Sequence, residues 1–313
     1  MKYRKLGQTG LDVSILSYGA SSLGSVFREI NETEGVKTVH TAIDQGINLI
    51  DVSPYYGLTK AENVLGKALV DIPRDKYILS TKAGRFGEND FDFSKKTIIK
   101  SLEESLQRLG TDYVDILYLH DIEFGSYEEV MEEGIPALEE LKKQGKIRFL
   151  GVTGLPLTIF DKVLSKVDLD VILSYCHYSL NDTSLLNLLP LLEEKQVGLV
   201  NASPLSMGLL NSRDVAKWHP ADEEMQQLCL NAAEYCAKHG YDLAKLAIQY
   251  STHNKSIPTT LVSTASVENI TKNIKWTEEP IDEGILDGVL DILEPIHNRT
   301  WQSGTAEWNK RYK

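Results

Sequence analysis

The chain has 313 residues, of which 42% are hydrophobic and 25% are charged, a composition typical of a globular protein. Its net charge of −12 disfavours binding to nucleic acid or to an anionic membrane, because the phosphates of both would be repelled. Three scattered cysteines, an N-terminus without a leader-like apolar stretch and no apolar run of membrane-spanning length predict a soluble, cytoplasmic protein without disulfides or a metal site.

A β-hairpin is predicted at residues 2–15, with its turn at QTG, where Gly10 can adopt a positive φ. After it, apolar runs alternate with segments of helical periodicity. The runs cover 16–20, 47–53, 77–82, 114–120, 146–154, 170–175, 198–203 and 259–264. Helices are expected at 33–46, 60–69, 94–110, 126–145, 156–166, 185–196, 223–239, 242–253, 266–274 and 283–296. Ser94 and Ser126 are expected to begin two of these helices and Gly110 and Gly145 to end them.

Eight such β/α units predict an α/β fold, a closed (β/α)8 TIM barrel. The runs are rich in Ile, Val and Leu without clean alternation, as in parallel strands buried on both faces. A Rossmann domain is disfavoured because no G-x-G-x-x-G opens a helix after a strand. We expect one domain over 1–313, with the hairpin at 1–15 and an extra C-terminal helix and tail at 283–313, as a monomer or small homo-oligomer.

Asp51, Tyr56, Lys82 and His120 lie at or just after the ends of consecutive runs. The carboxyl ends of barrel strands share one rim, so these side chains are expected to meet there. A free phenol has a pKa of about 10, and the Lys82 ammonium is expected to lower the pKa of Tyr56. Asp51 would keep Lys82 charged, and His120 would hydrogen-bond a substrate oxygen. Each residue alone could be structural, but the spacing of all four favours hydride-transfer chemistry.

The segments LIDVSPYYG, ILSTK and VDILYLH resemble the Asp, Tyr, Lys and His motifs of the aldo-keto reductase superfamily. KYRKLGQTGLDVSIL, YGASSLG, ELKKQGKIRFLGVTG and SPLSMGLL are similar to that family too, so the resemblance covers almost the whole chain. It implies a barrel with a hairpin at its base, a nicotinamide cofactor bound without a Rossmann fold, and Tyr56 as general acid/base.

Other stretches resemble the sugar-dehydrogenase branch of this superfamily: GASSLGSVF (19–27), HDIEFGS (120–126), LDVILSYCHYSLND (169–182) and EPIHNRTWQSG (294–304). They imply oxidation of a small-molecule aldose at C1 to the lactone, with L-galactose as first choice. The alternatives are a dehydrogenase of L-fucose or D-arabinose, a general aldehyde reductase, and a non-enzymatic redox-sensing subunit of an ion channel.

Around the cofactor the chain departs from the family pattern at several positions. Thr153-Gly154 replaces a common Ser-Asn pair, Tyr175 replaces a Gln, and Ala202 replaces a Tyr that stacks on the nicotinamide. Ala265 stands where many NADPH-preferring members have Arg, and it cannot pair with a 2′-phosphate. The resemblance therefore implies NAD rather than NADP, with Lys272 as the nearby cation that could soften this preference.

The resemblance also assigns the rest of the site. The cofactor residues are Ala20, Ser21, Asp51, Thr153, Tyr175, Ser203, Leu205, Met207, Gly208, Ser263, Ser266, Asn269 and Asn273. Those from 203 to 208 should line the pyrophosphate, with backbone amides and a helix start as donors, and those from 263 to 273 should hold the adenosine half. The substrate residues are Tyr56, His120, Asp121, Glu123 and Tyr178. The carboxylates of Asp121 and Glu123 suit sugar hydroxyls, and their alternative is a structural role in the loop.

Overall fold

The structure is a computed structural model that describes residues 1–26 and 28–309. Its N-terminal hairpin pairs β1 (Tyr3–Lys5) with β2 (Asp12–Ser14) in antiparallel register, as predicted. Gly10 at the turn has a φ of +74°. Leu6, Leu11 and Val13 of the hairpin segment pack with apolar side chains of the barrel strands, so the hairpin closes one end of the barrel.

Eight parallel strands form the closed barrel that the sequence predicted. They are β3 (Leu16–Gly19), β4 (Leu49–Asp51), β5 (Ile78–Ala83), β6 (Val114–Leu119), β7 (Ile147–Gly154), β8 (Val171–Tyr175), β9 (Gly198–Ala202) and β10 (Thr259–Ser263). The barrel closes because β10 pairs with both β9 and β3. Each strand lies within its predicted run, except that β5 extends one residue beyond it.

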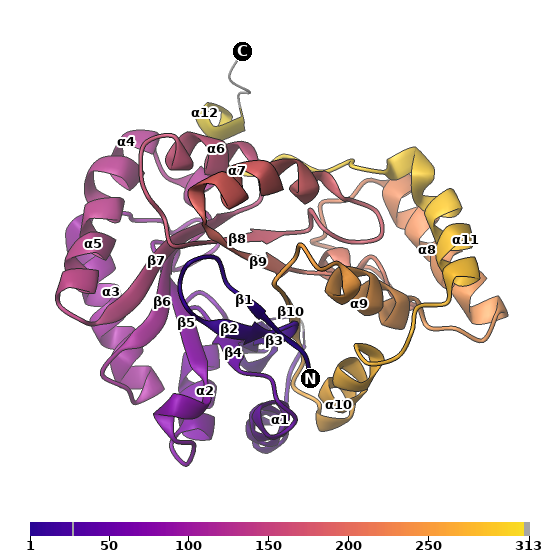
Figure 1. Ribbon diagram of the computed structural model, residues 1–313, viewed down its shortest axis with the longest axis horizontal. Coiled ribbons are helices and arrows are strands. Elements are labelled where there is room, and N and C mark those ends of the chain that lie inside the picture. Colours follow the sequence, from indigo (N-terminus) through magenta and orange to yellow (C-terminus); the bar gives the residue numbers. More distant parts are fainter. Residues whose placement is uncertain (27, 310–313) are drawn as a thin grey trace.

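Helices surround the barrel (Figure 1). They are α1 (Glu32–Asp44), α2 (Lys60–Leu69), α3 (Lys95–Leu109), α4 (Tyr127–Glu129), α5 (Ile135–Lys143), α6 (Thr158–Leu164), α7 (Leu189–Lys195), α8 (Glu223–Lys238), α9 (Leu243–His253), α10 (Val267–Trp276), α11 (Glu283–Leu293) and α12 (Ala306–Asn309). Figure 1 shows α8 and α11 side by side at one flank, where they share a separate apolar cluster that includes Cys229 and Cys236. The short α12 lies beside α6.

The helix caps follow the sequence in part. Gly110 ends α3 with a φ of +66°, and the Ser126 side chain accepts from the amide of Glu129, as expected. Ser94 is the N-cap residue that precedes α3, but its hydroxyl makes no capping bond. The helix expected over 126–145 is divided into α4, a π-helical turn at Val130–Gly134 and α5. Pro136 at the start of α5 has no amide hydrogen to continue a regular α-helical ladder.

Candidate active site

The four residues of the predicted hydride-transfer site meet at the C-terminal rim of the barrel. Asp51 ends β4, Lys82 lies near the end of β5, and His120 follows β6. Lys82 Nζ donates to Asp51 Oδ2 at 2.5 Å and to Tyr56 Oη at 3.2 Å. The rings of Tyr56 and His120 meet edge-on, with centroids 5.8 Å apart. The phenol therefore lies between an ammonium and an imidazole.

Two serines orient these groups. Ser80 Oγ donates to Asp51 Oδ1 at 2.7 Å, which leaves Oδ2 for Lys82. Ser53 Oγ lies 3.0 Å from His120 Nδ1 and accepts from a backbone amide. With Ser53 donating to Nδ1, the Nε2 of His120 carries the proton and can donate to a substrate oxygen.

A close backbone contact holds the loop that carries Tyr56. Gly57 has a φ of +63°, and a Cβ on it would lie 2.0 Å from the carbonyl oxygen of Gly24. A Cβ on Gly24 would in turn lie 2.5 Å from the carbonyl oxygen of Tyr56. Only glycine fits at both positions, and their contact places the tyrosine loop against the segment that follows β3.

Burial controls the ionisation of Tyr56. Desolvation raises the pKa of its phenol, and the Lys82 ammonium only partly offsets this. Lys82 lowers the pKa of Tyr56, as expected, but its contribution does not outweigh burial, so the net shift of the Tyr56 pKa is upward. The physical reason is that Asp51 already pairs with the ammonium and its own charge opposes a phenolate nearby.

The two basic members of the cluster respond differently to burial. For Lys82, burial alone would lower the pKa, but the contacts with Asp51 and Tyr56 outweigh it and the pKa is raised, so the side chain is an ammonium. For His120, burial is the main cause and lowers the pKa to about 3. His120 is therefore neutral at physiological pH and acts as a hydrogen-bonding group rather than as a cation.

Arg85 adds a charge to this rim that the sequence analysis missed. It follows Gly84, whose φ of +100° turns the chain at the end of β5. Its guanidinium forms an ion pair with Asp121, donates to Tyr55 Oη at 3.2 Å and lies 4.0 Å from the centre of the Tyr55 ring. The sequence could have indicated this contact, because Arg85 lies three residues after Lys82 and Tyr55 directly precedes Tyr56.

Asp121 and Glu123 have different environments although both were expected to contact sugar. Burial alone would raise the pKa of Asp121, but the Arg85 guanidinium and a hydrogen bond from Thr153 hold it below its ordinary value. Asp121 is thus an ionised carboxylate 3.7 Å from His120 Nε2. The hydroxyl of Thr153, expected at the cofactor, binds both the amide and the carboxylate of Asp121.

Glu123 is fully buried behind the rim. Its Oε1 accepts from the amide of Leu155 and from the hydroxyl of Ser303 in the C-terminal tail, each at 2.9 Å. Burial raises the pKa of Glu123 to about 8. A Cβ on Gly154 would lie 2.4 Å from Glu123 Oε2, so a larger residue at position 154 would collide with this carboxyl group. Glu123 therefore binds the tail rather than facing an open pocket.

Tyr178 lies outside the site, contrary to the expectation. Its hydroxyl accepts from Asn254 Nδ2 at 2.7 Å, and its ring stacks on Tyr250 of α9. The carbonyl of Asn254 in turn accepts from Arg4 of the N-terminal hairpin. The Tyr178 side chain is therefore engaged with α9 and the segment that follows it.

The expected cofactor residues occupy neighbouring strand ends. Ser263 at the end of β10 accepts from the amide of Ser22 and the hydroxyl of Ser21, both at 2.9 Å, next to Ala20. Among the other expected cofactor residues, Tyr175 ends β8, Ser266 is the N-cap of α10, and Asn269 and Asn273 lie within α10. The Ser266 hydroxyl accepts from the Asn269 amide as the cap of α10, so that interaction already employs one of its lone pairs.

The segment after β9 forms a concave turn. Positive φ angles occur at Ser203 (58°), Ser206 (46°), Met207 (54°) and Gly208 (107°), beside Leu205. The expected helix start is wrong, because these left-handed residues allow only a single 3-10 turn at Ser206–Gly208. Backbone turns of this kind direct amides into a concavity and are suited to bind phosphate groups. The segment therefore fits a pyrophosphate, although by a turn rather than by a helix.

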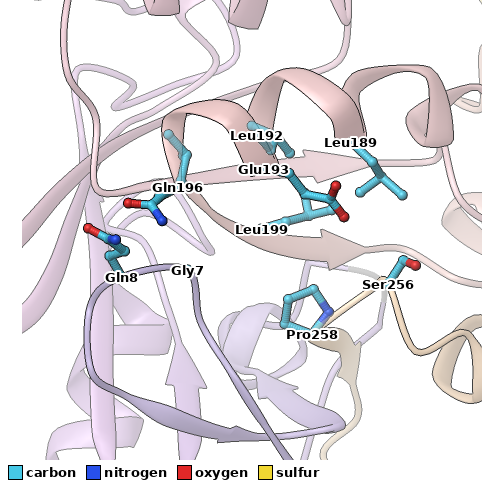
Figure 2. A pocket seen from close by; sticks show the side chains of 10 residues that line it. Gly7, Gln8, Leu189, Leu192, Glu193, Gln196, Leu199, Ser256 and Pro258 are labelled. Atoms are coloured by element: carbon cyan, nitrogen blue, oxygen red, sulfur yellow. The ribbon is translucent and has the colours of Figure 1, made fainter.

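A separate cavity of about 290 Å³ lies at the other end of the barrel (Figure 2). It is lined by the hairpin turn at Gly7 and Gln8, by residues of α7 such as Leu192, and by Ser256 and Pro258. The Gln8 amide donates to the carbonyl of Gln196, which joins the hairpin to α7. The cavity shares no residue with the cluster around Tyr56.

Residues 15–289 match the model of the Aldo/keto reductase family. The chain is an aldo-keto reductase. It is 49% identical to L-galactose dehydrogenase of Arabidopsis thaliana over 97% of this chain and 98% of that protein. It is 35% identical to D-arabinose 1-dehydrogenase of Saccharomyces cerevisiae over 76% of this chain and 75% of that protein.

A solved structure supports the fold. The holo form of an aldo-keto reductase from Bacillus halodurans aligns over 99% of this chain and 100% of its own, with a TM-score of 0.78 and 26% sequence identity. The protein is therefore an oxidoreductase that acts on CH–OH groups with a nicotinamide cofactor. Within the described ranges, no helix combines the length and apolar character needed to cross a membrane.

Proposed function

We propose that this aldo-keto reductase oxidises an aldose at C1 to the corresponding lactone, with NAD as the oxidant and L-galactose as the first-choice substrate. The observation that carries the proposal is the contact of Tyr56 Oη with the Lys82 ammonium, edge-on to a neutral His120. The 49% identity to L-galactose dehydrogenase over nearly the whole chain supports the choice of substrate.

The side chains handle the proton of the reaction. The C1 hydroxyl of the sugar donates to Tyr56 Oη, and His120 Nε2 binds the same oxygen. Tyr56 must first release its own proton to become the phenolate that receives the proton of the sugar, and Lys82 stabilises the negative charge of that form by its hydrogen bond to the phenol oxygen. The oxidised nicotinamide, when bound, supplies the acceptor for the C1 hydride. One hydride and one proton leave the sugar, so the products are the lactone, the reduced cofactor and a proton.

The rim residues fit a dinucleotide. The concave turn at 203–208 suits the pyrophosphate, and the hydroxyls of Ser21 and Ser263 with α10 suit the adenosine half. Two features support NAD over NADP. Ala265 has no cation to offer a 2′-phosphate, and Lys272 Nζ already binds Glu268 Oε1 at 2.5 Å, which reduces its availability.

Steady-state kinetics with L-galactose, L-fucose, D-arabinose and a simple aldehyde, each with NAD and with NADP, test this proposal. We expect the highest kcat/KM for L-galactose with NAD and a lactone as the product detected by mass spectrometry. The Tyr56→Phe variant is the control for enzyme-dependent turnover. Failure to oxidise any aldose, with activity confined to aldehyde reduction, would overturn the proposal.

The second candidate is a dehydrogenase for L-fucose or D-arabinose. It is favoured by the 35% identity to D-arabinose 1-dehydrogenase and by 28% identity to D-threo-aldose 1-dehydrogenase of a Pseudomonas species over 88% of this chain. The reaction and the roles of Tyr56 and His120 would be unchanged. The same sugar panel separates the two, because a higher kcat/KM for L-fucose or D-arabinose would select the second candidate.

A further inference from the structure

The guanidinium of Arg85 is enclosed by three aromatic rings at the edge of the active site. Its central carbon lies 4.0 Å from the ring centre of Tyr55 and 5.3 Å from those of Phe91 and Phe124. Phe91 and Phe124 stack on each other at 4.6 Å, with planes inclined by 11°. The Arg85 side chain is 15% exposed. The rings therefore hold the cation in one position before any ligand binds.

The cation and its partner carboxylate lie next to the reacting groups. Asp121 Oδ2, which pairs with Arg85, is 3.7 Å from His120 Nε2. The Tyr55 ring, which contacts the Arg85 guanidinium, has its centre 5.9 Å from that of the His120 ring and meets it edge-on. A sugar whose C1 oxygen binds Tyr56 and His120 would thus bring its neighbouring atoms to this ion pair.

A purely structural role leaves part of this arrangement unexplained. Asp121 already accepts a hydrogen bond from the Thr153 hydroxyl and donates its amide to the same oxygen, and these two contacts would anchor the loop without an arginine. Among the residues that the structure describes, none accepts a hydrogen bond from the buried Nε of Arg85. A guanidinium has five N–H donors, and those that bind Asp121 and Tyr55 use only part of them.

We propose that Arg85 and Asp121 together bind the hydroxyl at C2 of the sugar and select 2-hydroxyaldoses; this inference rests on the proposed function. C2 is bonded to the reacting carbon, so its hydroxyl lies next to the oxygen held by His120. The pair presents a donor and an acceptor side by side. A hydroxyl can accept from Arg85 and donate to Asp121 at once, whereas the ring oxygen on the other side of C1 can only accept.

The test compares kcat/KM for L-galactose, its 2-deoxy analogue and its 6-deoxy analogue L-fucose. Loss of a hydrogen bond to a charged group lowers affinity by about 10- to 150-fold. We therefore expect the wild-type protein to disfavour 2-deoxy-L-galactose by this factor relative to L-galactose. In Arg85→Met the 2-deoxy penalty should fall to within about threefold, while the ratio of L-galactose to L-fucose stays at its wild-type value.

Two further variants guard against loss of folding. Arg85→Lys keeps the charge but not the planar fork and should show an intermediate 2-deoxy penalty. Arg148→Met is the matched control, because it breaks an Arg–Asp pair with Asp115 at the N-terminal ends of β6 and β7, away from the active-site rim. This variant should keep the wild-type kcat/KM ratios among the three sugars. Thermal unfolding and NAD binding are measured for each variant.

The outcomes are distinct. If the wild-type protein uses L-galactose and 2-deoxy-L-galactose with nearly equal kcat/KM, the inference is overturned without any variant. So does an equal penalty in wild type and in a folded Arg85→Met. Absence of turnover with every aldose overturns the proposed function, and the inference falls with it.

Discussion

Replacing Asp51 with Asn tests the electrostatic basis of the site. The Asp51–Lys82 pair is almost completely buried, with side-chain exposures of 5% and 2%. The amide is close to the carboxylate in size but carries no charge, so the variant leaves a buried ammonium without its counter-ion. Burial is the largest influence on the Lys82 pKa and acts to lower it. In the variant, burial prevails and Lys82 favours the neutral amine.

The expected loss of stability in Asp51→Asn follows from the burial of the Asp51–Lys82 pair. Removing one partner of a buried ion pair costs about 3–5 kcal/mol. Because the pKa of Lys82 in the folded variant would lie below its unfolded value, the unfolded chain binds more protons between those two values. The stability of the variant should therefore rise with pH through that window. In the wild type the pKa of Lys82 is raised, so its contribution is retained up to the unfolded value and is lost only above it.

Urea unfolding at pH 7 and pH 9 measures both the loss of stability in the variant and its dependence on pH. We expect Asp51→Asn to be destabilised at pH 7 and to recover part of the loss at pH 9, with little oxidation activity at either pH. The control is the double variant Asp51→Leu/Lys82→Met, which removes both charges and should regain stability but not activity. If Asp51→Asn unfolds at the wild-type urea concentration at pH 7, the buried pair does not have the energetic role that its geometry indicates.

Three further changes test separate parts of the site. Tyr56→Phe should lower kcat by about 10²–10⁴-fold while NAD binding, followed by fluorescence, is retained; more than a tenth of wild-type kcat would exclude Tyr56 as the acid/base. Ala265 predicts at least a tenfold preference for NAD over NADP in kcat/KM, and Ala265→Arg should narrow or invert it; equal use of NADP by the wild type would instead point to Lys272. Burial raises the pKa of Glu123 to about 8, so its contribution to stability is complete below the ordinary glutamate pKa and is lost as the pH rises through 8. Glu123→Gln should remove this slope in urea unfolding between pH 5 and pH 8, and an unchanged slope would show that Glu123 ionises normally.

The sequence by itself determined the barrel and the convergence of the candidate catalytic residues on one rim. Strand and helix periodicity are local properties, and eight β/α units leave few other arrangements for the chain. Once the strands are parallel neighbours, the residues at their carboxyl ends must share a rim. Asp51, Lys82 and His120 therefore converge as a consequence of their positions in the chain.

Only the tertiary structure decided the electrostatics and the outer contacts of that cluster. The direction of the Tyr56 pKa depends on a balance between desolvation and nearby charges, which residue spacing does not contain. Glu123 accepts a hydrogen bond from Ser303, 180 positions away in the chain, and Tyr178 stacks on Tyr250 of α9. Arg85 meets Asp121 from a different strand end. Each of these depends on which side chains exclude water from one another, and that is settled only when distant segments pack.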